Sequence, residues 1–322
     1  MFSYKNYHKV KEEIEKRRRD AVALADARAE ELRALSPEIK EIDSELSTTG
    51  LSIFKAACSG GDVSAIRRRN KELCDRRAGL IRSLGYSDDY SEVKYFCKAC
   101  SDTGFIVGGK MCSCFREGLI KATIASSGIG DLIENQSFDN FDLEWYADDK
   151  SNYERMKEIL EKAKNFVKNF KKEKGNLLMV GTTGTGKTHL STAIAREIIN
   201  QGYDVIYDTI HNIVSDFEED KFRSGYSQEE PKSQKYLECD LLIIDDLGTE
   251  FSTQFSISCI YNLLNTRINQ GKSTVISTNL SSSELSSKYE GRIYSRIVGK
   301  SIILPFKGRD HRLPPQQTKT NS

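Results

Sequence analysis

Short apolar runs alternate with helical stretches along the second half of the chain. The apolar runs lie at 177–180, 205–207, 241–244, 274–277 and 302–304. Strands that alternate with helices in this way are typical of a parallel sheet. The pattern therefore predicts an α/β domain with a five-stranded parallel sheet over residues 151–312, opened by a helix from about residue 152 to residue 172.

The first half of the chain has a helical pattern. Residues 4 to about 47 contain no glycine and repeat apolar positions at helical spacing, and Pro37 is expected to begin a second helix. Breaks are expected at Thr48-Thr49-Gly50 and at Gly60-Gly61, before the pattern resumes from Val63 to Leu84. We expect a helical hairpin or small bundle.

This N-terminal arm, residues 1–90, has two interpretations. Its apolar stripes serve either a plain structural helix pair or a docking surface for a protein partner. The runs Arg17-Arg18-Arg19 and Arg67-Arg68-Arg69 are interpreted as solvated faces. Residues 91–118 follow as a segment rich in cysteine and glycine, then a linker at 119–150. The polar residues 313–322 are expected to be a disordered tail.

Composition narrows the classes of function. The 322 residues are 30% charged and carry a formal net charge of +1, so no overall charge favours nucleic acid or a membrane surface. No apolar run approaches the roughly 20 residues that span a bilayer, and residues 1–5 lack the apolar core of a secretory signal. A cytoplasmic protein is expected.

A glycine-rich loop directly follows the first apolar run of the α/β domain and directly precedes a helical stretch. Its glycines let backbone N–H groups turn toward phosphate oxygens, while Lys187 reaches the β- and γ-phosphates and Thr188 offers a hydroxyl to Mg²⁺. A plain glycine-rich turn is the alternative, which the strand–loop–helix context disfavours. The predicted ATP-binding residues here are Gly181, Thr182, Thr183, Gly184, Thr185, Gly186, Lys187 and Thr188.

Polar residues end two later strands. Asp245 and Asp246 follow the third apolar run, and ligands of parallel sheets bind at the carboxyl ends of strands. Asp245 is expected to hold Mg²⁺, and Asp246 to orient or deprotonate the attacking water. Asn279 ends the fourth strand and is a candidate for positioning that water or contacting the γ-phosphate.

The cysteines Cys97, Cys100, Cys112 and Cys114 form a C-x₂-C and C-x-C pair. Four thiolates suffice for tetrahedral Zn²⁺, so we interpret 91–118 as a zinc-binding module. A redox pair is the alternative, although no βαβ pattern surrounds Cys97. The remaining cysteines are interpreted as core residues, namely Cys58, Cys74, Cys239 and Cys259.

These motifs together resemble the AAA+ class of ATPases, and within it the DnaC/DnaI helicase-loader and IstB-like branch. The resemblance covers about residues 138–312, and less sharply 95–119. It rests on GTTGTGKTHL, LLIIDDLGTE, VISTNL, GRIYSRIVG and FKGRDHR, and on Phe138–Phe141, which looks like the element near the adenine in these proteins.

The resemblance implies a role for each matching residue. Lys187 and Thr188 match the Walker A positions and Asp245 the Walker B metal acid. Asp246 stands where most AAA+ proteins have a catalytic glutamate, a change that bears on the efficiency of hydrolysis and not on nucleotide binding. Asn279 matches sensor 1.

Two arginines complete the implied ATP site. Arg292 and Arg296 lie four residues apart on one helix face, where a surface role is the plain alternative. The resemblance makes Arg296 the arginine finger for a neighbouring subunit and Arg312 a sensor 2-like residue. It also implies that no helical lid domain follows the sheet.

The implied function is ATP-dependent loading of the replicative DNA helicase. The arm and zinc module would bind the hexameric helicase, the ATPase domain would bind single-stranded DNA, and subunits would associate through the ATP site. One alternative is an IstB-like transposition helper. Another is a nucleotide-dependent scaffold that hydrolyses little ATP, which the aspartate at 246 leaves open.

Overall fold

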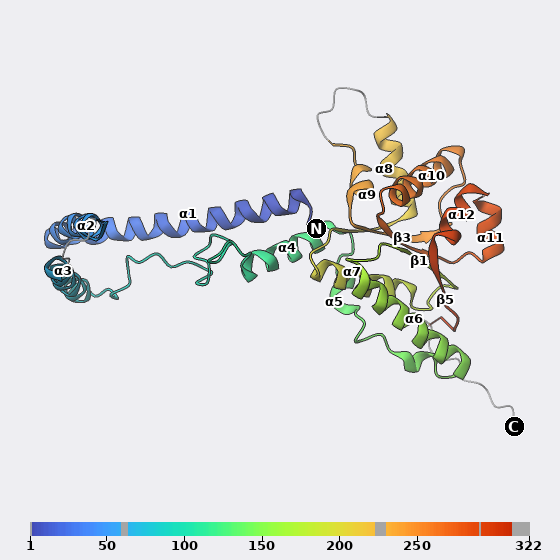
Figure 1. The fold of residues 1–322 in the computed structure, drawn as a ribbon, viewed down its shortest axis with the longest axis horizontal. Coiled ribbons are helices and arrows are strands. Elements are labelled where there is room, and N and C mark those ends of the chain that lie inside the picture. Colours follow the sequence, from blue (N-terminus) through green and yellow to red (C-terminus); the bar gives the residue numbers. More distant parts are fainter. Residues whose placement is uncertain (1, 59–63, 223–229, 290, 311–322) are drawn as a thin grey trace. The chain divides into compact units, whose positions relative to one another are not determined.

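The computed structural model describes residues 2–58, 64–222, 230–289 and 291–310 (Figure 1). The chain divides into two compact units, which are described separately below. One unit is formed by Lys9–Phe115, and the other by Met1–His8 together with Arg116–Ser322. Arg312 and the tail at 313–322 lie outside the described residues.

The larger unit is built on a parallel sheet of five strands. The strands are β1 (Asn176–Val180), β2 (Val205–Thr209), β3 (Leu241–Leu247), β4 (Ser273–Thr278) and β5 (Ser301–Pro305). They lie in the order β2-β3-β4-β1-β5, and every pairing is parallel. This confirms the predicted α/β class, because each strand contains one of the apolar runs found in the sequence.

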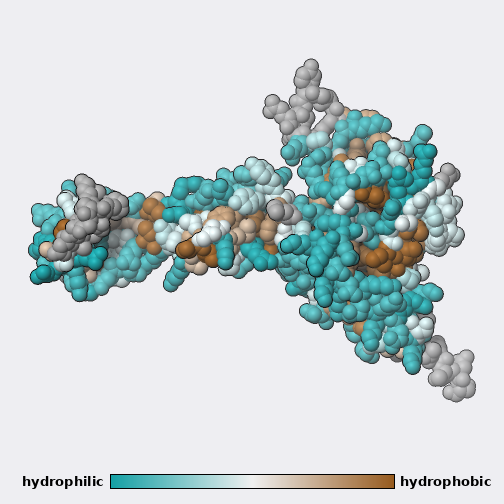
Figure 2. Space-filling model, viewed as in Figure 1, coloured by the Kyte–Doolittle hydropathy of each residue, from teal (hydrophilic) through white to brown (hydrophobic). Residues whose placement is uncertain are grey.

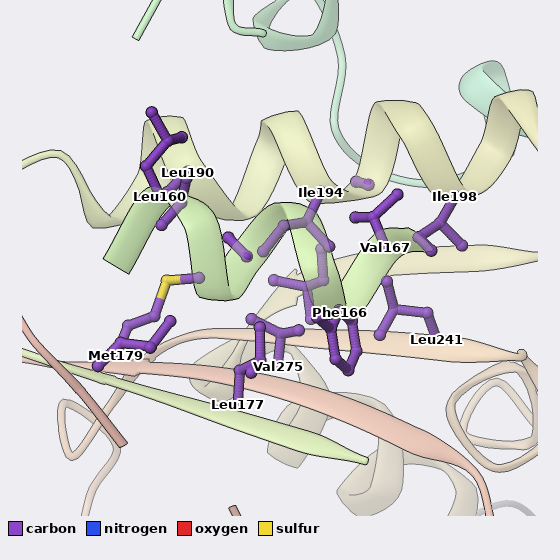
Figure 3. Packing of buried hydrophobic residues seen from close by; sticks show 14 of the residues in the cluster. Leu160, Phe166, Val167, Leu177, Met179, Leu190, Ile194, Ile198, Leu241 and Val275 are labelled. Carbon is purple, nitrogen blue, oxygen red and sulfur yellow. The ribbon is translucent and has the colours of Figure 1, made fainter. Parts of the chain in front are cut away.

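Helices cover both faces of this sheet, as Figure 1 shows. Successive strand residues point to opposite faces, so Leu177 and Met179 enter one core while Leu178 enters the other. Two helices pack on the first face (Figure 3), namely α6 (Lys150–Asn169) and α7 (Lys187–Asn200). The second face carries α8 (Ile210–Phe222), α9 (Gln234–Glu238), α10 (Gln254–Asn269), α11 (Ser282–Lys288) and α12 (Arg292–Gly299).

The segment expected to be a linker, 119–150, requires a correction. It contains most of α4 (Ser113–Ser126), then α5 (Leu132–Asn135) and a 3₁₀ turn, Leu143–Tyr146. Four of its side chains belong to the core of the first sheet face, namely Ile129, Ile133, Phe141 and Tyr146. The helix α4 crosses the expected boundary at residue 118, and the other two elements have only four residues each, too few to produce a sustained periodicity.

The two edges of the sheet differ. At the β2 edge, the Tyr207 N–H donates to the carbonyl of Ser127, which lies in the connection between α4 and α5. At the β5 edge, Ile302 and Ile303 are 51% and 43% exposed. Figure 2 shows several hydrophobic areas on the surface of the larger unit among mostly hydrophilic side chains. The α4–α5 connection is therefore part of the sheet's β2 edge.

The smaller unit is mainly helical. Its helices are α1 (Tyr4–Leu35), α2 (Pro37–Cys58) and α3 (Ser64–Ser83), and Pro37 begins α2 as expected. Leu32, Ile39 and Ile81 form a small fully buried core. Asp43, in α2, accepts from Arg33 at 2.9 Å and from Arg77 at 2.7 Å, which ties the three helices together.

The expected break at Thr48-Thr49-Gly50 is wrong, because α2 runs through these residues to Cys58. The Thr48 hydroxyl donates to the carbonyl of Ser44, four residues back, so the side chain's hydrogen-bonding capacity is satisfied within the helix. The expected break at Gly60-Gly61 lies outside the described residues.

The described part of the chain after β5 is short. Residues 306–310 contain no helix, so no helical lid follows the sheet within the described residues. Across the same described ranges, no helix is both long and apolar enough to cross a membrane.

Candidate nucleotide and metal sites

The glycine-rich loop connects the end of β1 to the start of α7. Gly186 is the N-cap of α7 and has φ +92°, a left-handed conformation that favours glycine. A Cβ at this position would lie 2.5 Å from the Tyr146 hydroxyl, which itself donates to the Thr185 carbonyl at 3.0 Å. The Thr185 hydroxyl closes the loop by donating to the Thr182 carbonyl at 2.8 Å. This geometry presents the N-terminus of α7 as an anion-binding site.

Lys187 is the central cation of the loop. Its ammonium group is directed inward and donates to the carbonyls of Gly181 at 2.6 Å and Thr182 at 2.7 Å. It also donates to Asn279 Oδ1 at 2.8 Å, and Asn279 Nδ2 in turn donates to Asp246 Oδ1 at 3.3 Å. Three residues singled out in the sequence, far apart along the chain, thus form one hydrogen-bonded chain.

A local irregularity of β3 sets the direction of the two aspartates. The register of the β3–β4 pair shifts between Ile244 and Leu247, and Asp246 has φ +54°. Such bulges redirect side chains and are frequent beside active sites. The irregularity begins after four fully buried residues, so β3 carries its acids just beyond the core.

The Asp245 carboxylate is held through both of its oxygens. Oδ1 accepts from the Ser277 hydroxyl and from the Asp246 N–H at 3.2 Å, while Oδ2 accepts from the Tyr207 hydroxyl at 2.6 Å. Burial and the charge of Asp245 raise the pKa of Tyr207, while the hydroxyls of Ser191 and Thr188 act to lower it. Asp245, one of the two predicted Mg²⁺ ligands, is therefore held by hydroxyl groups from both neighbouring strands.

A cavity of about 690 Å³ opens beside the loop. Its polar side includes Lys187, Thr188, Asp246 and Asn279. Its other side is largely aromatic and amide-bearing and comes from the segment that was expected to be a linker, with Gln136, Asn140, Phe141, Trp145 and Tyr146. A cleft with an aromatic side and a polar, phosphate-binding side has the size and chemistry of a nucleotide site.

His189 connects this aromatic side to α7. Its Nε2 lies 3.0 Å from both the Ser137 carbonyl and Asn140 Oδ1, and its ring meets the Phe141 ring edge-on at 5.2 Å. Within the segment 119–150, the sequence singled out only Phe138–Phe141. Trp145, Tyr146 and Tyr207 had no motif to mark them, and Ser277 lay within VISTNL without a role of its own.

Arg296 does not line the cavity. Its guanidinium donates twice to Asn265 Oδ1, at 3.0 and 2.8 Å, and lies 4.6 Å from the Tyr261 ring centroid. Arg292 lines a separate open groove of about 820 Å³ between α10 and α12. The structure therefore places both arginines away from the chain's own ATP site. The sensor 2 candidate, Arg312, lies outside the described residues.

The four clustered cysteines converge in the smaller unit. The sulfurs of Cys97, Cys100, Cys112 and Cys114 all lie within 4.8 Å of one another. Burial alone would raise the pKa of Cys100, but the Gly104 N–H and the neighbouring thiols outweigh it and lower that pKa to about 7. The cluster has the number and type of donors that a structural zinc site requires.

A buried carboxylate supports the first cysteine pair. Asp102, only 1% exposed, accepts from the N–H groups of Phe96 at 2.7 Å and Cys97 at 3.0 Å. Arg17 of α1 pairs with it at 3.2 Å and lies over the Phe96 ring at 4.5 Å. The expectation that Arg17 belongs to a solvated face is therefore wrong, because it neutralises a buried charge.

The other cysteines partly match their interpretation as core residues. Cys239 and Cys259 are buried, whereas Cys74 is exposed, so the interpretation is wrong for Cys74. The side chain of Cys58 lies outside the described residues.

A phosphate loop between β1 and α7, acids at the end of β3 and a polar residue after β4 define a P-loop nucleotide-binding protein with an AAA+ core. Residues 135–319 match the model of the IstB-like ATP binding proteins. The chain belongs to this family.

The individual relatives named below are at most 28% identical to this chain. The replicative helicase loader DnaC of Escherichia coli (strain K12) is 28% identical over 194 residues, which cover 60% of this chain and 76% of DnaC. The phage-like element PBSX protein XkdC of Bacillus subtilis (strain 168) is 27% identical over 226 residues, covering 65% and 80% of the two chains. The crystal structure of the DnaC helicase loader aligns with a TM-score of 0.47 and 24% identity, over 55% of this chain and all of that one.

Proposed function

We propose that this protein is an ATP-dependent loader of the replicative DNA helicase. The observation that carries the proposal is the similarity to DnaC, a replicative helicase loader, over 76% of DnaC's length. Two features of the chain support it. Hydrogen bonds connect Lys187, Asn279 and Asp246 of the ATP site, and the helical arm belongs to a separate unit. ATP would switch the protein's grip on the helicase and on single-stranded DNA.

ATP binding would exchange hydrogen bonds within the phosphate loop. Lys187 now donates to two loop carbonyls, and the β- and γ-phosphates offer its ammonium a stronger, charged acceptor. Mg²⁺ prefers oxygen ligands, so the Thr188 hydroxyl and the Asp245 carboxylate suit it. When bound, it would neutralise charge on the phosphates. Asn279 would then be released from Lys187 to contact the γ-phosphate or the attacking water.

Asp246 is the proposed base for hydrolysis. Its carboxylate is partnered by Asn279 and lines the cavity, so it can orient a water molecule toward the phosphate end of the cleft. An aspartate reaches less far than a glutamate would from the same position. We therefore expect slow hydrolysis, whose rate would set how long the ATP-bound assembly lasts.

The cysteine cluster is proposed to hold one structural Zn²⁺. The four sulfurs already converge, and the segment around them has only a few buried apolar side chains, such as Phe115. Metal ligation can supply folding free energy that so small a core cannot. The arm and this module together would form the helicase-binding part of the protein.

Arg296 is proposed to act on the ATP site of a neighbouring subunit. Asn265 and Tyr261 hold its guanidinium half-exposed, which orients it before assembly. A second subunit placed against this face would receive a positive charge near its γ-phosphate. Self-association through the ATP site would thereby become dependent on ATP.

The family model itself supports a second candidate, an IstB-like transposition helper. Full-length protein, with ATP or ADP, should be mixed with the purified replicative helicase of its host and, separately, with a candidate transposase. ATP-dependent capture of the helicase, reduced in Lys187→Ala, is expected. Capture of the transposase alone would favour the helper, and capture of neither would overturn both assignments.

A further inference from the structure

We infer that Tyr207 is a positioning residue for the metal-binding carboxylate of Asp245. This inference rests on the proposed ATP site and adds to it a residue that none of the sequence motifs contains. The Tyr207 hydroxyl donates to Asp245 Oδ2 at 2.6 Å, the distance expected of a strong hydrogen bond from a hydroxyl to a charged acceptor. Tyr207 comes from β2, the strand next to β3 at the edge of the sheet.

The hydrogen bond restricts the carboxylate because the other oxygen is also held. Ser277, from β4 on the opposite side of β3, donates to Oδ1, as does the Asp246 N–H. Donors on both sides prevent rotation of the carboxylate plane. Oδ2 accepts from Tyr207 and keeps lone-pair capacity for a cation or for a water molecule bound to it. Outer partners of this kind tune the affinity of metal ligands.

Tyr207 is itself held from outside the sheet. Its N–H donates to the Ser127 carbonyl at 2.6 Å, and its side chain is only 7% exposed. Gly128 packs against its carbonyl so closely that a Cβ would lie 2.4 Å from the oxygen. Gly128 also has φ +82°, a conformation that other residues rarely adopt. The α4–α5 connection therefore sets the position of the hydroxyl that contacts Asp245.

The test uses the full chain and a fluorescent ATP analogue, whose binding is measured without Mg²⁺ and then across a Mg²⁺ titration. In Tyr207→Phe, the Mg²⁺ concentration that gives half of the maximal change in analogue binding should rise about 10-fold. This is a typical cost of losing an outer partner of a metal ligand. Affinity without Mg²⁺ should stay within about 2-fold, because the phenol does not line the nucleotide cavity. Ser277→Ala should shift the titration in the same direction.

Tyr203→Phe is the matched control, because Tyr203 precedes β2 and its ring packs edge-on against Phe170 at 4.9 Å. An unchanged Mg²⁺ titration in Tyr207→Phe, or an equal shift in Tyr203→Phe, would overturn the inference. Melting temperatures identify a variant that has lost its fold. If Tyr207→Phe does not fold, the Mg²⁺ titration of Ser277→Ala tests the inference, because Ser277 holds the other oxygen of the same carboxylate. If the wild-type protein binds no nucleotide, the proposed function itself fails.

Discussion

Lys187 is a buried cation whose ammonium group donates to three neutral acceptors, namely two carbonyls and an amide oxygen. Such neutral acceptors compensate only part of the cost of burying a charge. The residue is therefore poised to accept an anion. Exchanging these acceptors for phosphate oxygens would require no large rearrangement of the core beneath the loop.

Replacing Lys187 with alanine should reduce ATP affinity at least about 100-fold, since hydrogen bonds to charged groups contribute about 1.5–3 kcal/mol each. Calorimetric titration of ATP would measure the loss. Lys300→Ala, which removes an exposed lysine just before β5, is the control and should bind ATP normally. Retained tight binding in Lys187→Ala would contradict the phosphate-loop assignment.

Asp204 gives the molecule a pH-dependent stability. Burial, and then the neighbouring charge of Asp240, raise the pKa of Asp204 to about 6. The folded state therefore binds the proton more tightly than the unfolded state does. The stabilisation by this proton is complete below the unfolded pKa and is lost as the pH rises through about 6.

Asp204→Asn should therefore raise the free energy of unfolding at pH 7 by about 1–2 kcal/mol, a value discounted because the side chain is only half-buried. It should also flatten the pH dependence of stability between about pH 4 and pH 6. Urea unfolding at several pH values would show both effects. Asp148→Asn, at an exposed position, should show neither, and a destabilised Asp204→Asn at pH 7 would contradict the account.

At the scale of elements, α1 and the cysteine module depend on each other. Arg17 reaches from α1 to the buried Asp102, and Arg18 lies over the Tyr95 ring at 5.8 Å. Further along α1, Glu31 accepts from the hydroxyls of Tyr86 at 3.0 Å and Tyr90 at 2.7 Å. The chain that leads into the module is therefore attached to α1 at several points.

We expect about one zinc ion per chain in protein purified without chelator, and its loss when Cys97 and Cys100 become serine. Arg17→Ala should keep the metal but release it to a chelator about 10-fold faster, because Asp102 would remain buried without its cation. A colorimetric zinc indicator would follow the release. Arg19→Ala removes an exposed arginine of the same run, and an equal rate for it would contradict the role of Arg17.

At the scale of the whole molecule, we propose that a second subunit completes the ATP site by contributing its Arg296. In the described chain, this arginine is held by α10 and does not line the cavity. Arg296→Ala should therefore bind ATP normally but hydrolyse it at least about 10-fold more slowly, since arginine fingers contribute 10³-fold or more in some ATPases and GTPases.

Mixing two variants tests this directly. Lys187→Ala lacks the phosphate contact but keeps Arg296, whereas Arg296→Ala keeps an intact phosphate loop. Together they should recover part of the hydrolysis that neither shows alone, as measured by phosphate release. Arg292→Ala, one turn away on α12, is the control for the surface charge. Absence of any recovery, with both proteins folded, would contradict action between subunits.

Local sequence patterns were sufficient to predict much of this fold. Five apolar runs predicted the five parallel strands, Pro37 marked the start of α2, and the spacing of Cys97, Cys100, Cys112 and Cys114 predicted a cluster. Each of these features depends on neighbours within a few residues, or on residue types whose chemistry permits few roles. The segment 119–150 escaped prediction because α4 crosses its expected boundary and its other elements have only four residues each.

The sequence by itself determined the phosphate loop, the acids near the end of β3 and the class of the sheet, because each of these depends on contiguous residues. Only the tertiary structure decided that Tyr207 and Ser277 hold Asp245 and that Arg17 neutralises Asp102. Those contacts join residues between 32 and 85 positions apart. They exist because strand order and helix packing bring distant side chains together, which no local periodicity encodes.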